Sequence, residues 1–125
     1  MLATANAAKA RELAAGLAGI PYRLLALADF PGVTLPPEGG DSYTENALAK
    51  ARAAAAATGA LALADDSGIE VDALDGAPGV LSARYGGEGR SDAERCATML
   101  EALKGVPPLQ RSARYRCVIA IAEPG

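Results

Sequence analysis

The sequence predicts an α/β fold in which helices pack against a sheet. Half of the residues are hydrophobic but only 4% are aromatic, so we expect a core that depends on close approach of backbones rather than on large rings. Two segments carry the spacing of a helix capping box ahead of good helix formers. Short apolar runs between and after these segments are typical of strands.

The first third of the chain predicts a very short apolar start at Met1 to Thr4, then a helix and a second strand. Asn6 has the position of an N-cap, and a helix is expected from Ala7 to about Leu17. Tyr22 to Leu27 has the composition of a strand, and the proline- and glycine-rich stretch after it predicts a long loop. A loop of that length usually has a function.

The middle of the chain predicts a helix followed by a buried strand. Ser42 to Glu45 has capping-box spacing, and the alanine-rich helix that it opens is expected to reach Thr58 and stop at Gly59. Residues 60–64 form an apolar run that suits a buried strand. We expect that strand to end in an acidic turn, Asp65-Asp66-Ser67-Gly68, and a strand to resume over residues 69–72.

The last third predicts a helix and a strand. A second capping box starts at Ser91 and opens a helix that ends before Gly105. Ser112 to Ala122 alternates in part and predicts a strand. A length of 125 residues fits one small domain, residues 1–125.

Composition excludes several classes of function. With 12 basic against 15 acidic residues, interleaved, the chain has no electrostatic footprint for a nucleic-acid polymer. No apolar run approaches membrane-spanning length. Two isolated cysteines and no histidine exclude the usual zinc patterns and histidine-dependent catalytic triads. Acid–base chemistry must therefore use other groups, such as carboxylates, and a reducing cytoplasm is the expected compartment.

Two segments are candidates for binding a metal and a phosphate. Adjacent carboxylates at Asp65 and Asp66 repel each other unless a cation or proton offsets their charge, and Mg²⁺ is the natural candidate. Ser67 and Gly68 could offer N–H groups to a phosphate, although a plain Asx turn also explains the four residues. Residues 4–9, Thr-Ala-Asn-Ala-Ala-Lys, could hold a phosphate at a helix N-terminus, or Asn6 could simply cap the helix.

Four further charged residues permit two interpretations each. Glu38 and Glu45 are both candidates to complete a magnesium site with Asp66, but solvation accounts for the first and a capping role for the second. Lys50 and Arg84 are either phosphate contacts or ordinary exposed cations.

The chain resembles the inosine/xanthosine triphosphate pyrophosphatase family, Ham1-like enzymes that hydrolyse non-canonical purine triphosphates to monophosphate and pyrophosphate. The resemblance covers nearly the whole chain and rests on four motifs in one order: Thr4-Ala5-Asn6 with Lys9; Ser42-Tyr43-Thr44-Glu45-Asn46-Ala47 with Lys50; Ala64-Asp65-Asp66-Ser67-Gly68; and Gly76-Ala77-Pro78-Gly79 with Ser82-Ala83-Arg84-Tyr85.

The resemblance implies a mixed, twisted sheet flanked by helices, the fold shared by Maf and Ham1 proteins. It also implies Mg²⁺ as cofactor, a nucleoside triphosphate as substrate, a homodimer, and a role for each candidate residue. Asp66 would be the catalytic proton acceptor and a metal ligand, with Glu38 as the second metal ligand. The substrate contacts would be Thr4, Ala5, Asn6, Ala7, Ala8, Lys9, Lys50 and Ser67, supported by Asp65, Glu45 and Arg84.

The sequence departs from the family pattern in two places. Ala5 stands where the family usually has glycine or another small residue, which would cost stability if that turn required a positive φ. The segments that recognise the purine base in the family have no counterpart before Gly125, so we expect a C-terminally truncated, partial domain. Two alternatives to catalysis on purine triphosphates follow: a non-catalytic fragment that binds nucleotide or dimerises, or a Maf-type pyrophosphatase.

Overall fold

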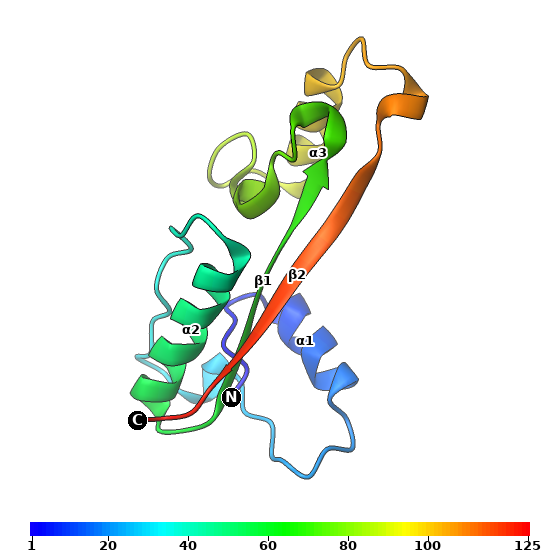
Figure 1. Cartoon of the computed structure of the whole chain (residues 1–125). Helices are drawn as coiled ribbons and strands as arrows, with labels where there is room; N and C mark the ends of the chain where they lie inside the picture. Colours follow the sequence, from blue (N-terminus) through cyan, green and yellow to red (C-terminus); the bar gives the residue numbers. More distant parts are fainter. The chain divides into compact units, whose positions relative to one another are not determined.

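The computed structural model describes residues 1–125 and confirms the predicted α/β character (Figure 1). Its α-helices, 3₁₀ helices (η) and strands follow in the order α1 (Ala7–Gly16), η1 (Leu27–Asp29), α2 (Tyr43–Thr58), β1 (Ala62–Val71), η2 (Asp72–Leu74), η3 (Gly79–Arg84), α3 (Asp92–Ala102), η4 (Pro108–Gln110) and β2 (Ala113–Ala122). No helix combines the length and the apolar character that crossing a membrane requires.

The chain forms two compact units. The first comprises residues 1–66 and 118–125, and the second comprises residues 67–117. Each of the two strands contributes residues to both units. The expectation of a single domain over residues 1–125 stays a prediction.

The strands pair in a mixed pattern, as the family resemblance implies. β1 and β2 form a two-stranded sheet. The N–H of Asp72, directly after β1, donates to the carbonyl of Ser112, directly before β2, at 3.0 Å, so these strands run antiparallel. Leu2 adds parallel bridges to Ala26 and to Leu63 of β1.

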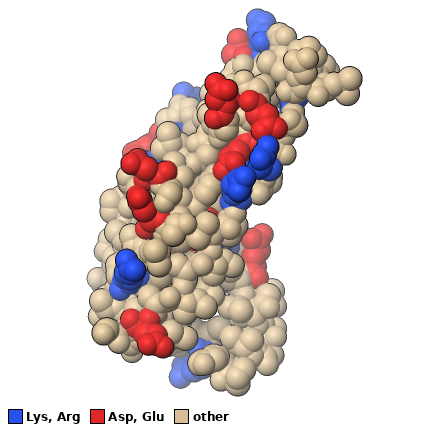
Figure 2. Space-filling view, in the orientation of Figure 1, with Lys and Arg blue, Asp and Glu red and all other residues tan.

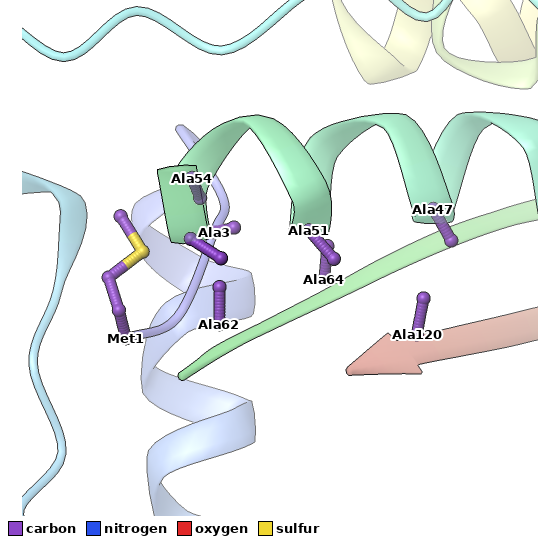
Figure 3. Packing of buried hydrophobic residues seen from close by; sticks show 9 residues of the cluster. Met1, Ala3, Ala47, Ala51, Ala54, Ala62, Ala64 and Ala120 are labelled. Atoms are coloured by element: carbon purple, nitrogen blue, oxygen red, sulfur yellow. The ribbon is translucent and has the colours of Figure 1, made fainter. Parts of the chain in front are cut away.

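The core of the first unit consists mostly of alanine. Ala47, Ala51, Ala54 and Ala55 of α2 are fully buried against Ala3, Ala62, Ala64, Ala120 and Met1 (Figure 3). Because a methyl group adds little thickness, the helix backbone can lie close to the strands. Any polar side chain on this face of α2 is therefore held near β1.

The helices begin and end where the sequence predicts. The Ser42 side chain accepts the N–H of Glu45 at the start of α2, and Gly59 adopts a left-handed conformation at its end. α3 has the complete capping box between Ser91 and Glu94. These capping contacts involve only neighbouring residues, so they do not depend on how the rest of the chain folds.

Two strand predictions are wrong. Residues 22–27 form no strand beyond the single bridge at Ala26, because the Asp29 carboxylate accepts the Ala26 N–H at 2.8 Å and turns the chain into η1. The predicted acidic turn after Ala64 is also absent. β1 runs unbroken from Ala62 to Val71 through both aspartates.

Close packing in the second unit explains why the glycine at position 68 lies in a strand rather than a turn. A Cβ on Gly68 would lie 2.7 Å from Ser82 Oγ and 2.9 Å from the carbonyl carbon of Gly79, with the Gly79 oxygen closer still. Ser82 Oγ accepts the Ile69 N–H at 2.9 Å and donates to the Gly79 carbonyl at 2.6 Å. Gly68 therefore allows the backbone of η3 to lie close to β1.

Candidate active site

Asp65 and Asp66 point to opposite faces of β1. Successive side chains in a strand alternate in direction, and the contacts follow this rule. Asp65 Oδ2 lies 3.1 Å from Lys9 Nζ of α1, whereas Asp66 Oδ2 accepts a hydrogen bond of 2.9 Å from Asn46 Nδ2 of α2. Both aspartates are buried, at 4% and 3% exposure. The two carboxylates therefore belong to different environments, with one helix on either side.

The predicted phosphate-binding segment is the capped N-terminus of α1. Asn6 is the N-cap, and its Oδ1 accepts the Lys9 N–H at 3.1 Å, while Thr4 Oγ1 accepts the Asn6 N–H at 3.1 Å. Residues 5–8 are exposed there. Ala5 has no positive φ, since Asp75 alone among non-glycine residues does, so alanine carries no strain in this turn.

α2 supplies two buried polar side chains one turn apart. Asn46 is 2% exposed and Lys50 is 6% exposed, among the alanines that face the core. Residues four apart share a helix face. Of the two interpretations of Lys50, that of an ordinary exposed cation is therefore wrong. Asn46, which sequence reasoning left out of the site, lies at its centre.

The loop that carries Glu38 is attached to the first turns of α2. Lys50 Nζ lies 2.5 Å from Glu38 Oε1, and Asn46 Oδ1 accepts the Gly40 N–H at 2.8 Å. Glu45 Oε2 accepts the Asp41 N–H at 3.1 Å, one residue before the N-cap Ser42, so Glu45 does not complete the predicted capping box of α2. Side chains from the first turns of α2 thus hold the loop beside Asp66.

The surroundings of Asp66 raise the pKa of its carboxyl group. Burial is the largest cause, and the neighbouring Glu38 carboxylate raises the pKa further. The hydrogen bond from Asn46 and the positive charge of Lys50 act in the opposite direction. Once ionised, a carboxylate with a raised pKa is a stronger base than an exposed aspartate.

Not all predicted residues lie in this cluster. Glu38, Lys50 and Asp66 come together in the first unit, with Lys9 and Asp65 on the other face of β1. Ser67 is the first residue of the second unit, and Arg84 is an exposed residue at the end of η3 in that unit. No group of three or more His, Cys, Asp or Glu side chains lies close enough together to hold a metal ion.

Charges of both signs lie in small groups on the face of the molecule drawn in Figure 2. No large basic patch is visible in that view, in keeping with the net charge of −3.

Comparison with known proteins gives a consistent result. The sequence profile of the Ham1 family matches residues 1–125. A dITP/XTP pyrophosphatase of Desulforamulus reducens is 54% identical over 124 residues, which cover 99% of this chain and 62% of that protein. A dITP/XTP pyrophosphatase of Geobacter sulfurreducens is 53% identical over 125 residues, which cover 100% of this chain and 63% of that protein.

The solved structures that superimpose well on this chain are also Ham1 proteins. A HAM1 protein from Coxiella burnetii superimposes with a TM-score of 0.87 at 43% identity, covering 98% of this chain and 62% of that one. The Staphylococcus aureus Ham1 protein gives a TM-score of 0.82 at 35% identity, with the same coverage. The chain thus spans somewhat over three fifths of the length of the relatives that it matches.

Proposed function

The chain belongs to the Ham1 family, and from that premise we propose that it hydrolyses non-canonical purine nucleoside triphosphates, ITP, dITP and XTP, to the monophosphate and pyrophosphate. The observation that carries the proposal is the buried Asp66, whose pKa is raised and which lies beside Glu38 and Lys50. Relatives about half identical to this chain are dITP/XTP pyrophosphatases.

Oxygen ligands from Glu38 and Asp66 fit a magnesium ion. Mg²⁺ typically takes one or two carboxylates, keeps several waters and uses substrate phosphates for the rest of its coordination. The two carboxylates of Glu38 and Asp66 suit that mode. When bound, Mg²⁺ would offset the charge of the phosphate oxygens and polarise the attacking water.

Asp66 and Lys50 have different roles in the proposed reaction. Asp66 accepts the proton of the water that attacks the phosphorus next to the nucleoside. Lys50, buried at 6% exposure, offers a positive charge to the triphosphate and keeps Glu38 in place. A carboxylate would be a strong enough base for a water that a bound Mg²⁺ polarises.

The proposed triphosphate contacts extend from the N-terminus of α1. Exposed N–H groups and the positive end of a helix dipole favour phosphate, and residues 5–8 are open there. Lys9 adds a cation that also neutralises Asp65. Ser67, next to Asp66 in β1, is proposed as a further substrate contact, and Arg84 as a supporting residue.

The proposed assembly is a homodimer in the cytoplasm. What supports association is an apolar hollow of about 290 Å³ in the first unit, lined by residues such as Leu17, Leu24, Leu61 and Ile121. Ile119 and Ile121 of β2 are also 56% and 62% exposed. Sedimentation at two concentrations tests the proposal, and a monomer at the higher concentration would contradict it.

Release of pyrophosphate from ITP and Mg²⁺ tests the function. Asp66→Asn keeps the shape of the side chain and removes the base, so turnover is expected to fall at least about 100-fold. Asp75→Asn is the matched control, because Asp75 is exposed in a left-handed conformation that asparagine also adopts.

Three results would count against catalysis as proposed. Turnover retained by Asp66→Asn would remove Asp66 from the mechanism. Binding of nucleotide without any turnover would favour the alternative of a non-catalytic fragment. Preference for nucleotides other than ITP, dITP and XTP would favour the Maf-type specificity that the family assignment argues against.

A further inference from the structure

We propose that Asn46 is a positioning residue that fixes the Glu38 loop and Asp66 relative to each other. The inference rests on the proposed function, in which Glu38 and Asp66 act together. Asn46 does not bind the substrate in this proposal. It acts through its two neighbours, and the contacts of its side-chain amide carry the argument.

Both ends of the Asn46 amide are used. Nδ2 donates to Asp66 Oδ2 at 2.9 Å, and Oδ1 accepts from the Gly40 N–H at 2.8 Å. The Gly40 N–H can only donate, so the atom facing it must be the amide oxygen, and the amide nitrogen must then face Asp66. A single rigid amide therefore connects the loop at Gly40, two residues after Glu38, with Asp66, which lies 20 positions after Asn46.

The loop backbone approaches this amide more closely than a side chain at position 40 would permit. A Cβ added to Gly40 would lie 2.7 Å from Asn46 Oδ1 and 2.9 Å from Glu45 Oε2. Real Cβ atoms do not come so close to other atoms, so Gly40 is the residue that allows the contact. The close approach accompanies the hydrogen bond from the Gly40 N–H to Asn46 Oδ1 and involves the same pairing of loop and amide.

Packing alone does not explain an asparagine at this position. Asn46 is 2% exposed on a face that is otherwise built from Ala47, Ala51 and Ala54. Asparagine is a poorer helix former than alanine, and burial of an amide costs free energy unless its hydrogen bonds are made. An apolar residue would satisfy the core, whereas the amide is satisfied only by the loop and Asp66.

Lys50 and Asn46 together attach the loop at two points. Lys50 holds the Glu38 carboxylate directly, and Asn46 holds the backbone at Gly40. Two contacts from one rigid helix limit the movement of the loop. We therefore infer that Asn46 presents the two proposed metal-binding carboxylates in a preformed arrangement, as residues behind metal ligands commonly do.

Two variants separate this role from a purely structural one. Asn46→Ala removes both hydrogen bonds. Asn46→Asp has nearly the same size and still accepts from Gly40, but an ionised carboxylate at this position has no N–H for Asp66. Gln110→Glu makes the same change from amide to acid at an exposed position and serves as the control.

Three measurements read out the proposal. Hydrogen exchange of the Gly40 amide, followed by NMR, is expected to accelerate at least about 10-fold in Asn46→Ala and to stay slow in Asn46→Asp. Calorimetry with Mg²⁺ alone is expected to show about 10-fold weaker binding in Asn46→Ala. With ITP, both variants are expected to lose kcat about 10-fold or more, with KM changed much less, and Gln110→Glu to match the parent chain.

The outcomes distinguish failure of this inference from failure of the proposed function. A parent-like kcat in Asn46→Asp would show that Asn46 only anchors the loop, and unchanged Gly40 exchange in Asn46→Ala would show that it does not anchor the loop at all. Either result overturns the proposal. If the parent chain releases no pyrophosphate, the proposed function fails, while the exchange and Mg²⁺ measurements still decide the role of Asn46.

Discussion

Substitution of Gly68 by alanine tests how tightly β1 and η3 pack in the second unit. The new methyl group would meet the Gly79 carbonyl and Ser82 Oγ, the latter at 2.7 Å. Neither neighbour can yield freely, because Ser82 Oγ bonds both the Ile69 N–H and the Gly79 carbonyl. Overpacking costs about 2 kcal/mol, and two weakened hydrogen bonds add about 1 kcal/mol each. The variant is expected to lose about 3 to 4 kcal/mol of unfolding free energy.

Urea denaturation followed by circular dichroism measures this loss. Gly16→Ala is the control, since a Cβ at position 16 meets nothing within 4 Å and alanine favours the helix that ends there. We expect the control to be neutral or slightly more stable. A loss below about 1 kcal/mol in Gly68→Ala, at an unchanged denaturant slope, would refute the reasoning that the glycine is required for close approach.

Two further predictions concern the charges of the first unit. The folded-state pKa of Asp66 lies above its unfolded value, so the ionised carboxylate lowers the free energy of unfolding once the pH rises through the folded value. In urea denaturation at pH 7, Asp66→Asn should therefore be more stable than the parent chain. This difference in unfolding free energy should vanish below about pH 4, where the carboxyl group is protonated in both states. A difference that persists at low pH would contradict this explanation. Lys50→Met removes the cation that pairs with Glu38, a side chain that is one third exposed. The thermal midpoint should fall by an amount equivalent to about 1 to 2 kcal/mol. An unchanged midpoint would show that the ion pair contributes nothing to stability.

The sequence predicted the helices well because their signals are local. Ser42 and Ser91 cap α2 and α3, and Gly59 ends α2. Each signal involves only a few neighbouring residues, so no knowledge of the remaining fold was needed. Strands lack such signals. The stretch 22–27 had strand composition, yet one carboxylate, that of Asp29, was sufficient to redirect the chain.

The course of β1 could not be predicted from its own residues. Asp-Asp-Ser-Gly has the composition of a turn, and strands are depleted of aspartate and glycine. The segment is nonetheless extended because partners distant in the sequence satisfy it. Lys9 and Asn46 contact the two aspartates from opposite faces, and Gly79 lies against Gly68.

Asn46 was missed for a related reason, although a signal for it existed. Its two partners lie in a loop and in a strand, and no helical pattern reveals either. However, Asn46 and Lys50 are four residues apart in a stretch that is otherwise rich in alanine, so they share one helix face. Two polar side chains on the face that buries Ala47 and Ala51 indicate a buried polar site, and that comparison requires only the sequence.

Departures from local preference therefore locate the site better than any one motif does. Asn46 and Lys50 are polar residues on the apolar face of a helix, and Asp65 and Asp66 are two acids in the middle of a buried strand. Each placement is unfavourable on its own. The four side chains offset one another's cost only in combination with Lys9 and Glu38, across three elements and a loop. A chain selected for stability alone would place apolar residues there, so the concentration of these exceptions around Asp66 is itself an argument that the cluster serves chemistry.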